Sequence, residues 1–160
     1  MRLKISNNYS PNFSIPKRKN KKIKFIVIHY TGMKNENAAI KRLCDESKNV
    51  SAHYFIKKNG EMINLVPDLY VAWHAGKSKW LNYNSLNKNS IGIEIQNTGH
   101  EIKYKNFSTK QLGSLKILLR ILIKKYKINL KNVLGHSDIA PERKKTLEKS
   151  FPGKILLIIN

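Results

Sequence analysis

The sequence predicts a single α/β domain, on the basis of its size, its apolar strands and one long amphipathic helix. With 160 residues, 41% of them hydrophobic, the chain can bury one core but is short for two domains. Apolar runs at residues 24–29 and 90–96 have the length and composition of buried strands. The helix expected after Ser108 carries an apolar stripe, so we expect it to cover the sheet.

Shorter segments indicate how the chain connects these two strands. Residues 36–48 have the helical spacing of apolar side chains and are expected to form a helix. Residues 52–57 and 61–66 alternate apolar and polar side chains and are joined across Lys58-Asn59-Gly60. Because Asn-Gly favours a tight turn between antiparallel strands, we expect a β-hairpin here.

The strand at 90–96 has a two-residue alternation. Isoleucines alternate along it with a glycine and two polar residues: Ile91-Gly92-Ile93-Glu94-Ile95-Gln96. Successive side chains of a strand point to opposite faces of the sheet. If the isoleucines face the core, Glu94 faces the other side and can protrude into a cleft. The ordinary alternative for Glu94 is a solvent-facing strand residue.

The long helix has the clearest start signal in the chain. Ser108 and Gln111 have the spacing of a capping box, and Phe107 and Leu112 can form a hydrophobic staple across it. The stripe that is expected to face the sheet consists of Leu112, Leu115, Leu118, Leu119, Leu122 and Tyr126.

Cysteine content and apolar run lengths limit the class of protein. The lone Cys44 excludes an internal disulfide framework, and its place beside Ile40 and Leu43 favours a small core residue over a redox role. No apolar run reaches the roughly 18 residues of a transmembrane helix. The first residues lead into a polar segment without the apolar stretch of a signal peptide. We therefore expect no membrane span and a cytoplasmic protein by default, with export by another route as the alternative.

The formal net charge of +21 is the strongest compositional deviation and suggests a polyanionic partner. The charge is spread along the chain, with one dense run at residues 17–22 inside a Pro-punctuated basic N-terminal arm, residues 1–22. Since this distribution lacks the clustering of a nucleic-acid-binding face, we expect no specific nucleic acid and favour attraction to polyanionic surfaces, cell-wall polymers included. Nothing in the sequence indicates an oligomeric state.

Two histidines far apart in the chain are candidates for one metal site. His29 closes the first apolar strand, and His136 lies in a loop bounded by Gly135 and Pro141. A histidine at a strand end and one in such a loop can converge on a zinc ion. His53 and His74 also lie in apolar or Gly-bounded contexts, whereas an isolated histidine is more often a core or surface residue.

Five short motifs occur in order and at fitting separations along residues 23–145. Together they closely resemble the zinc-dependent N-acetylmuramoyl-L-alanine amidases, a family that includes phage amidase lysozymes and peptidoglycan recognition proteins. The motifs are Ile28-His29-Tyr30-Thr31, Val50-Ser51-Ala52-His53-Tyr54, Ala72-Trp73-His74-Ala75-Gly76, Ser90-Ile91-Gly92-Ile93-Glu94 and Gly135-His136-Ser137-Asp138-Ile139-Ala140-Pro141.

The resemblance implies a mixed central sheet flanked by helices, with a zinc-site groove on one face. It identifies an amidase domain at 23–154, between the basic arm and an apolar tail at 155–160. It places two Zn²⁺ ligands on His29 and His136, and it assigns peptidoglycan or a muropeptide as the substrate.

The same resemblance assigns the remaining site residues. Glu94 would take a proton from the attacking water, and Lys144 would stabilise the oxyanion. His53, Trp73 and His74 would line the groove, although packing in the core is the ordinary alternative for Trp73.

The chain departs from the family at the third zinc ligand. Family members continue from an Arg-Lys pair into Asp-Pro-Gly, with the aspartate on zinc, whereas this chain has Thr146. One choice of synonymous codons for residues 145–154, shifted by one base, encodes Asp-Pro-Gly-Glu-Lys-Phe-Pro-Trp-Lys, the ending that the family has. The hypothesis is that the chain from Thr146 onward, with the tail at 155–160, results from a frameshift.

Three functions follow from these observations. The first is zinc-dependent hydrolysis of the amide bond between N-acetylmuramic acid and L-alanine, impaired to the extent that Thr146 fails as a ligand. The second is a non-catalytic peptidoglycan-binding module, which Thr146 favours and the retained Glu94 and Lys144 oppose. The third is a basic nucleic-acid-binding protein, which explains the charge and none of the motifs.

Overall fold

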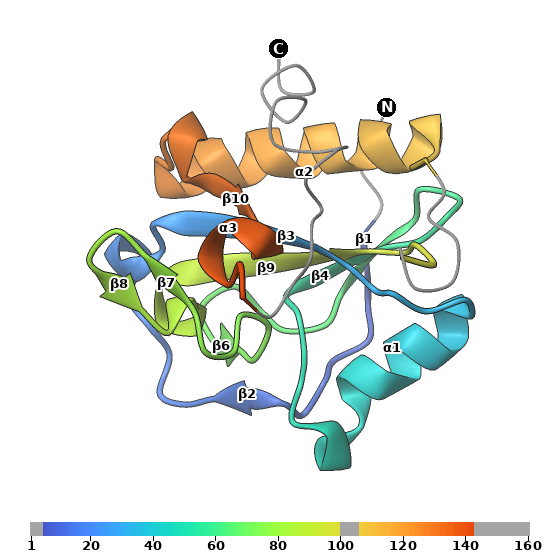
Figure 1. The fold of residues 1–160 in the computed structure, drawn as a ribbon, viewed down its shortest axis with the longest axis horizontal. Coiled ribbons are helices and arrows are strands. Elements are labelled where there is room, and N and C mark those ends of the chain that lie inside the picture. Colours follow the sequence, from blue (N-terminus) through green and yellow to red (C-terminus); the bar gives the residue numbers. More distant parts are fainter. Residues whose placement is uncertain (1–4, 100–105, 143–160) are drawn as a thin grey trace.

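A computed structural model describes residues 5–99 and 106–142, and in it a mixed sheet lies between helices on both faces (Figure 1). The predicted α/β class and mixed sheet are confirmed. In spatial order the strands are β1 (Ile5–Asn7), β5 (Met62–Asn64), β4 (Tyr54–Ile56), β9 (Ser90–Ile95), β3 (Phe25–Tyr30) and β10 (Val133–Gly135). All neighbours pair in parallel except β4 and β5. Lys144, Thr146 and the tail at 155–160 lie outside the described residues.

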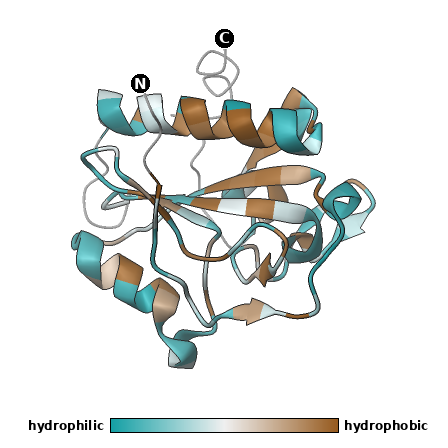
Figure 2. Cartoon of the chain, turned by 180° about the vertical axis from the view of Figure 1, so that it is seen from behind, coloured by the Kyte–Doolittle hydropathy of each residue, from teal (hydrophilic) through white to brown (hydrophobic). Residues whose placement is uncertain are grey.

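The core on one side of the sheet is formed by the isoleucines of the two long strands and by α2 (Thr109–Tyr126). Ile91, Ile93 and Ile95 of β9 are fully buried against this helix, as the alternation predicts. In Figure 2, hydrophobic residues, drawn in brown, make up much of the sheet and the middle of α2. Because these isoleucines face α2, the alternate residues of β9 face the other side of the sheet.

The predicted start of α2 is confirmed. The Ser108 side chain accepts a hydrogen bond from the Gln111 N–H, and the Gln111 side chain accepts one from the Ser108 N–H. Phe107 and Leu112 both pack against the core cluster. Reciprocal capping satisfies two N–H groups that the first turn leaves without helical partners.

The helix expected at 36–48 ends earlier, as α1 (Glu36–Cys44) followed by a 3₁₀ turn, η2 (Glu46–Lys48). Asp45 separates the two, because it adopts an extended conformation and its carboxylate accepts from the Ser47 N–H at 2.9 Å. Such a local side-chain bond competes with continuation of the helix. Leu43 of α1 packs in the cluster that covers the second face of the sheet.

Residues 5–22, expected as a basic arm, are integrated into the fold. Strand β1 pairs with β5 at the sheet edge, and β2 (Phe13–Ser14) pairs with β6 (Val71–Ala72). Backbone hydrogen bonding along these strands offsets the cost of ordering a polar, charged segment. The high positive charge of this region gave no indication that β1 and β2 would pair with other strands.

Arg18 shows how one charge of the basic run is accommodated inside the protein. Its guanidinium donates to the Asp68 carbonyl at 2.8 and 3.2 Å and to the Asn87 carbonyl at 2.9 Å. Burial lowers the pKa of Arg18 to about 10, with the Asp68 carboxylate opposing that shift. The planar guanidinium of arginine suits such multiple contacts. Arg18 thereby ties the N-terminal segment to the loop at Asp68 and to the 3₁₀ helix that contains Asn87.

The expected hairpin is confirmed as β4 and β5, whose residues pair antiparallel. Gly60 in its turn has φ +86°, a conformation that favours glycine. The remaining elements are η1 (Asn20–Lys22), β7 (Lys79–Trp80), β8 (Tyr83–Asn84), η3 (Leu86–Asn89), η4 (Leu130–Asn132) and α3 (His136–Ile139). Over residues 5–99 and 106–142, none of the helices combines the length and the apolar character that crossing a bilayer requires.

We predict that Asp68→Ala lowers the free energy of unfolding by about 2–6 kcal/mol, because each of two buried hydroxyls that loses its acceptor costs about 1–3 kcal/mol. The Asp68 carboxylate accepts from the hydroxyls of Tyr54 and Tyr126 at 2.6 Å each and pairs with Lys125. Urea unfolding measures the change.

Glu61→Ala is the matched control for Asp68→Ala, because Glu61 forms an exposed ion pair with Lys57. Removing such a pair is expected to cost about 0–1 kcal/mol. Equal losses in the two variants would show that Asp68 does not act as a buried anchor.

Candidate metal centre and catalytic pocket

Strand pairing brings the three central candidates together. In the parallel pair β3 and β9, His29 lies opposite Glu94. In the parallel pair β10 and β3, Gly135 lies opposite Ile28, so that the next residue, His136, follows β10 beside His29. Parallel strands end at the same edge of a sheet, where open α/β sheets commonly bind their ligands. Residues separated by more than a hundred positions are thus collected at one edge.

The geometry of the two histidines fits a shared metal ion. Their Nδ1 atoms face each other at 2.8 Å. Zinc–nitrogen bonds of about 2.0–2.1 Å and a tetrahedral angle put two ligand nitrogens about 3.3 Å apart. Small movements of the rings would therefore accommodate one ion, and neutral imidazole is among the ligands that zinc prefers.

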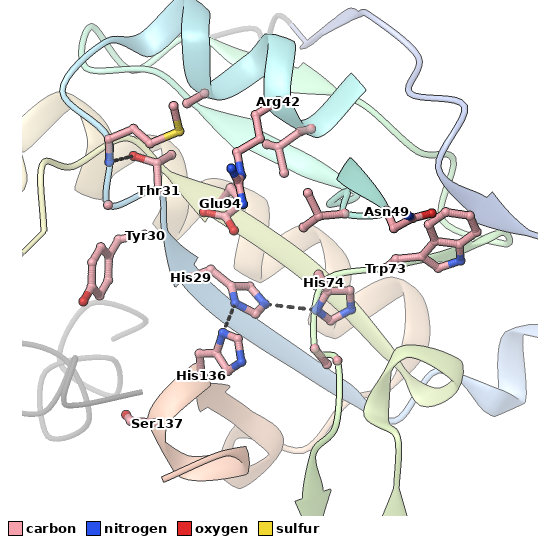
Figure 3. A pocket seen from close by; sticks show the side chains of 17 residues that line it. His29, Tyr30, Thr31, Arg42, Asn49, Trp73, His74, Glu94, His136 and Ser137 are labelled. Atoms are coloured by element: carbon pink, nitrogen blue, oxygen red, sulfur yellow. Dashed lines mark hydrogen bonds between the residues drawn. The ribbon is translucent and has the colours of Figure 1, made fainter. Parts of the chain in front are cut away.

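A pocket of about 500 Å³ opens above these residues. His29, His136, Glu94, Trp73 and His74 all line it, together with Arg42 and residues of the loops after β3 and before β4. Figure 3 shows the Glu94 carboxylate and the His29 ring on the same side of the sheet, with Arg42 extending from α1 toward Glu94. The cavity therefore combines the nitrogens of the two candidate metal ligands with a carboxylate and a cation.

His74 lines the pocket and contacts the candidate ligand His29. Its Nδ1 is 3.0 Å from His29 Nε2, and its Nε2 is 3.1 Å from the Ser90 hydroxyl. Burial, followed by the nearby His53 and Arg18, lowers the pKa of His74 well below its ordinary value, so His74 is neutral. This side chain can position His29 as well as touch a bound molecule.

The structure does not bring His53 to the pocket. Its ring is completely buried, its Nδ1 accepts from the Gly92 N–H at 3.0 Å, and its Nε2 lies 3.1 Å from the Tyr70 carbonyl. Burial and the adjacent Arg18 lower its pKa to about 3. The buried hydrogen bonds of His53 indicate a structural role. Its position outside the pocket does not support direct contact with a substrate.

Trp73 lies at the other end of the pocket, half-buried, with its indole N–H donating to the Ser14 hydroxyl at 2.8 Å. The N-terminal segment therefore orients one wall of the pocket. Because the ring lines the cavity and is not in a core cluster, it is available for contact with a bound molecule.

α3 holds the second candidate ligand. His136 is its first residue, and the Asp138 carboxylate accepts from the Gly135 N–H at 2.7 Å, which fixes the turn into the helix. Within residues 5–99 and 106–142, no group of three His, Cys, Asp or Glu side chains is arranged to hold a metal. The candidate catalytic Lys144 and the third-ligand position Thr146 lie outside these ranges.

Sequence reasoning missed the residues that support the site. Arg42 belongs to a helix whose polar face gave no sign that it borders a cleft. Asn87 is an ordinary polar residue in its local sequence, and Ser90 opens one of the five motifs but was assigned no role. The Asn87 side chain accepts from the N–H groups of His74 and Ala75 at 3.1 and 2.7 Å. The alternation of β9 could have indicated Ser90, because it shares a face with Glu94.

Comparison with known proteins places the chain in a family. The family model described as N-acetylmuramoyl-L-alanine amidase matches residues 19–153. The chain belongs to this amidase family. The family match agrees with the resemblance of the five motifs.

Individual amidases are similar over much of this chain. N-acetylmuramoyl-L-alanine amidase AmiD of Escherichia coli is 38% identical over 147 residues, which cover 84% of this chain and 52% of AmiD. The 1,6-anhydro-N-acetylmuramyl-L-alanine amidase AmpD of Escherichia coli is 41% identical over 95 residues, covering 59% of this chain and 50% of AmpD. The chain thus spans about half the length of these relatives.

A solved amidase structure shares the fold. The complex of Escherichia coli AmiD with the substrate anhydro-N-acetylmuramic acid-L-Ala-D-γ-Glu-L-Lys aligns with a TM-score of 0.75 and 35% identity, covering 86% of this chain and 57% of AmiD. The sheet with helices on both faces is therefore the amidase fold.

We predict that the free energy of unfolding falls as the pH is lowered from about 6.5 toward 3, in part through His53. The folded state keeps His53 neutral, with its pKa lowered to about 3, whereas the unfolded chain binds a proton near the ordinary value of 6.5. The stabilisation is complete above pH 6.5, and its loss contributes at most about 1.4 kcal/mol per pH unit.

Urea unfolding of the wild type and of His53→Gln at several pH values measures this effect. The variant should show a shallower dependence on pH in the same window. Parallel curves for the two proteins would exclude His53 as a contributor.

Proposed function

We propose that this chain is a zinc-dependent amidase that hydrolyses the bond between N-acetylmuramic acid and L-alanine in peptidoglycan or its fragments. The observation that supports it most is the pair of facing Nδ1 atoms of His29 and His136, 2.8 Å apart, in a pocket also lined by Glu94. Family membership gives the reaction class, and these side chains are of the types that the reaction requires.

His29 and His136 would hold the ion. When bound, zinc supplies an activated water and polarises the carbonyl of the scissile amide. Glu94, from the strand next to His29, accepts the proton of the water and returns it to the departing amine of L-alanine. Lys144 stabilises the negative charge that develops on the carbonyl oxygen.

The walls of the pocket suit a muropeptide. AmiD has been solved with an anhydromuropeptide, and the corresponding ligand class is our proposal for this chain. Trp73 offers an aromatic face to a sugar or peptide, and Arg42 offers a cation to a carboxylate of the stem peptide. The +21 charge would draw the protein toward polyanionic cell-wall polymers.

Incubation of the zinc-loaded protein with an anhydromuropeptide tests the proposal directly. The expected products are anhydro-N-acetylmuramic acid and the free peptide, detected by mass spectrometry, with loss of turnover when a chelator removes zinc. Binding of murein without turnover under all metal conditions would instead identify a non-catalytic peptidoglycan-binding module, the second candidate that Thr146 favours.

Glu94→Gln is expected to lower turnover by about 10²–10⁴-fold, because it removes the proton acceptor. Zinc affinity should remain nearly unchanged, since the substitution removes no ligand. Steady-state kinetics and a competitive zinc titration measure the two effects.

Glu61→Gln is the control for Glu94→Gln, because Glu61 is a surface carboxylate outside the pocket. It should leave turnover and zinc affinity as in the wild type. Full activity in Glu94→Gln would remove Glu94 from the proposed mechanism.

Thr146→Asp is expected to raise zinc affinity by at least about 10-fold, since loss of a partner that only supports a ligand already costs about 10–100-fold. Turnover should rise with zinc occupancy. Thr146→Asn is the matched control, because it has the size of aspartate without the charge. If neither variant binds zinc more tightly than the wild type, another group already provides the third ligand.

A further inference from the structure

A chain of hydrogen-bonding groups runs behind His29, on the side away from His136. It passes from His29 to His74, then to the Ser90 hydroxyl, and ends at the Leu86 carbonyl. Figure 3 shows His29 between the other two histidine rings, with one ring nitrogen directed at each. The two nitrogens of His29 therefore have different partners, and the partner of one determines the state of the other.

We propose that His74 and Ser90 are positioning residues that hold His29 in the tautomer with its proton on Nε2, which leaves the Nδ1 lone pair directed at the metal position. This inference rests on the proposed function, because it assigns a purpose to the Nδ1 lone pair. Its first consequence, the tautomer, concerns the metal-free protein.

The hydrogen bond to the Leu86 carbonyl determines which group donates in each of the other hydrogen bonds of this series. The Ser90 hydroxyl has a single proton and donates it to the Leu86 carbonyl at 2.7 Å. Its contact of 3.1 Å with His74 Nε2 then has to use an oxygen lone pair. The proton of that hydrogen bond therefore belongs to His74 Nε2.

The next step transmits this direction to the ligand. A neutral histidine with its proton on Nε2 has a lone pair on Nδ1. His74 Nδ1 therefore accepts from His29 Nε2 across 3.0 Å, which places the single proton of a neutral His29 on Nε2. His29 Nδ1 is then an acceptor, and in the metal-free protein its 2.8 Å partner, His136 Nδ1, has to donate. A bound metal ion would take the place of that proton.

The position of the His74 ring is fixed by the surrounding structure. A Cβ atom at Gly92 would lie 2.3 Å from His74 Cγ, so the absence of a side chain on β9 makes room for the ring. The Asn87 side chain holds the backbone of His74 by accepting its N–H at 3.1 Å. Ser90, Gly92 and Glu94 alternate on the same face of β9, so one strand provides the anchor, the space and the candidate base.

The tautomer can be measured in the zinc-free chain by long-range ¹H–¹⁵N correlation of the imidazole rings, with His29→Gln and His74→Gln spectra to assign the signals. We expect His29 and His74 each with a proton on Nε2 and an acceptor-type Nδ1. A proton on Nδ1 of His29 would overturn the proposal whether or not the chain binds zinc or hydrolyses muropeptides.

Variants of His74 test the consequence for metal affinity. His74→Leu should weaken zinc binding by about 10–100-fold, as expected for loss of a group that orients a ligand. His74→Asn should recover most of this loss, because its amide oxygen can replace Nδ1 as the acceptor. Equal affinity of wild type and a folded His74→Leu would contradict the inference.

Ser90→Ala and Ser78→Ala form a matched pair that avoids a large change in the core. Both hydroxyls contact the backbone of Leu86, but Ser78 accepts from its N–H and is outside the chain of groups. Ser90→Ala should weaken zinc binding and give His74 a mixture of tautomers, whereas Ser78→Ala should do neither. Equal effects of the two variants on zinc affinity would show that only general packing is involved and would overturn the assignment.

If no variant, nor the wild type, binds zinc, the proposed function fails while the spectrum of the zinc-free protein still decides the tautomer. If the wild type binds zinc and hydrolyses muropeptides but the tautomer is reversed, the proposed function stands and the role of His74 and Ser90 falls.

Discussion

The parallel register of β10, β3 and β9 is the constraint on which the rest of the site depends. It sets His136, His29 and Glu94 next to one another at a single sheet edge. On the opposite face, β3 and β9 present isoleucines to α2, and β10 presents Val133. A shift of β9 by one residue would turn Glu94 toward the helix and an isoleucine toward the pocket. Hydrophobic packing on one face of the sheet thus fixes the positions of His29, His136 and Glu94 on the other face.

Much of the fold could be predicted from the sequence because its signals are local. The isoleucine alternation of β9, the Asn-Gly turn of the hairpin and the capping box at Ser108 each depend on a few adjacent residues. The N-terminal segment could not be predicted in this way. Strand β1 forms only because β5 offers a free edge, and Arg18 is buried only because distant carbonyl groups accept its protons. The density of basic residues in this segment did not indicate that β5 would pair with β1 or that carbonyl groups would accept from Arg18.

The candidate site was predictable in its composition and less so in its arrangement. Both His53 and His74 lie in apolar local sequence, yet only His74 lines the pocket. The difference arises from tertiary neighbours: Gly92 leaves space for the His74 ring, whereas the Gly92 N–H and the Tyr70 carbonyl engage His53. A short motif contains no information about such distant groups. The motifs therefore identified the residues, but they did not distinguish a residue that lines the pocket from one that supports the structure around it.

The pairing of β1 with β5 has a consequence for any shortened form of the protein. The family match begins at residue 19, and a boundary chosen there would remove β1 and β2. Strand β5 would then become an open edge, whose unpaired N–H and C=O groups are a template for association between molecules. The last turn of α1 would also lose a hydrogen bond, because the Ser10 hydroxyl donates to the Leu43 carbonyl at 2.6 Å. A segment without any candidate site residue therefore governs whether a shortened domain exposes a sheet edge that other molecules can pair with.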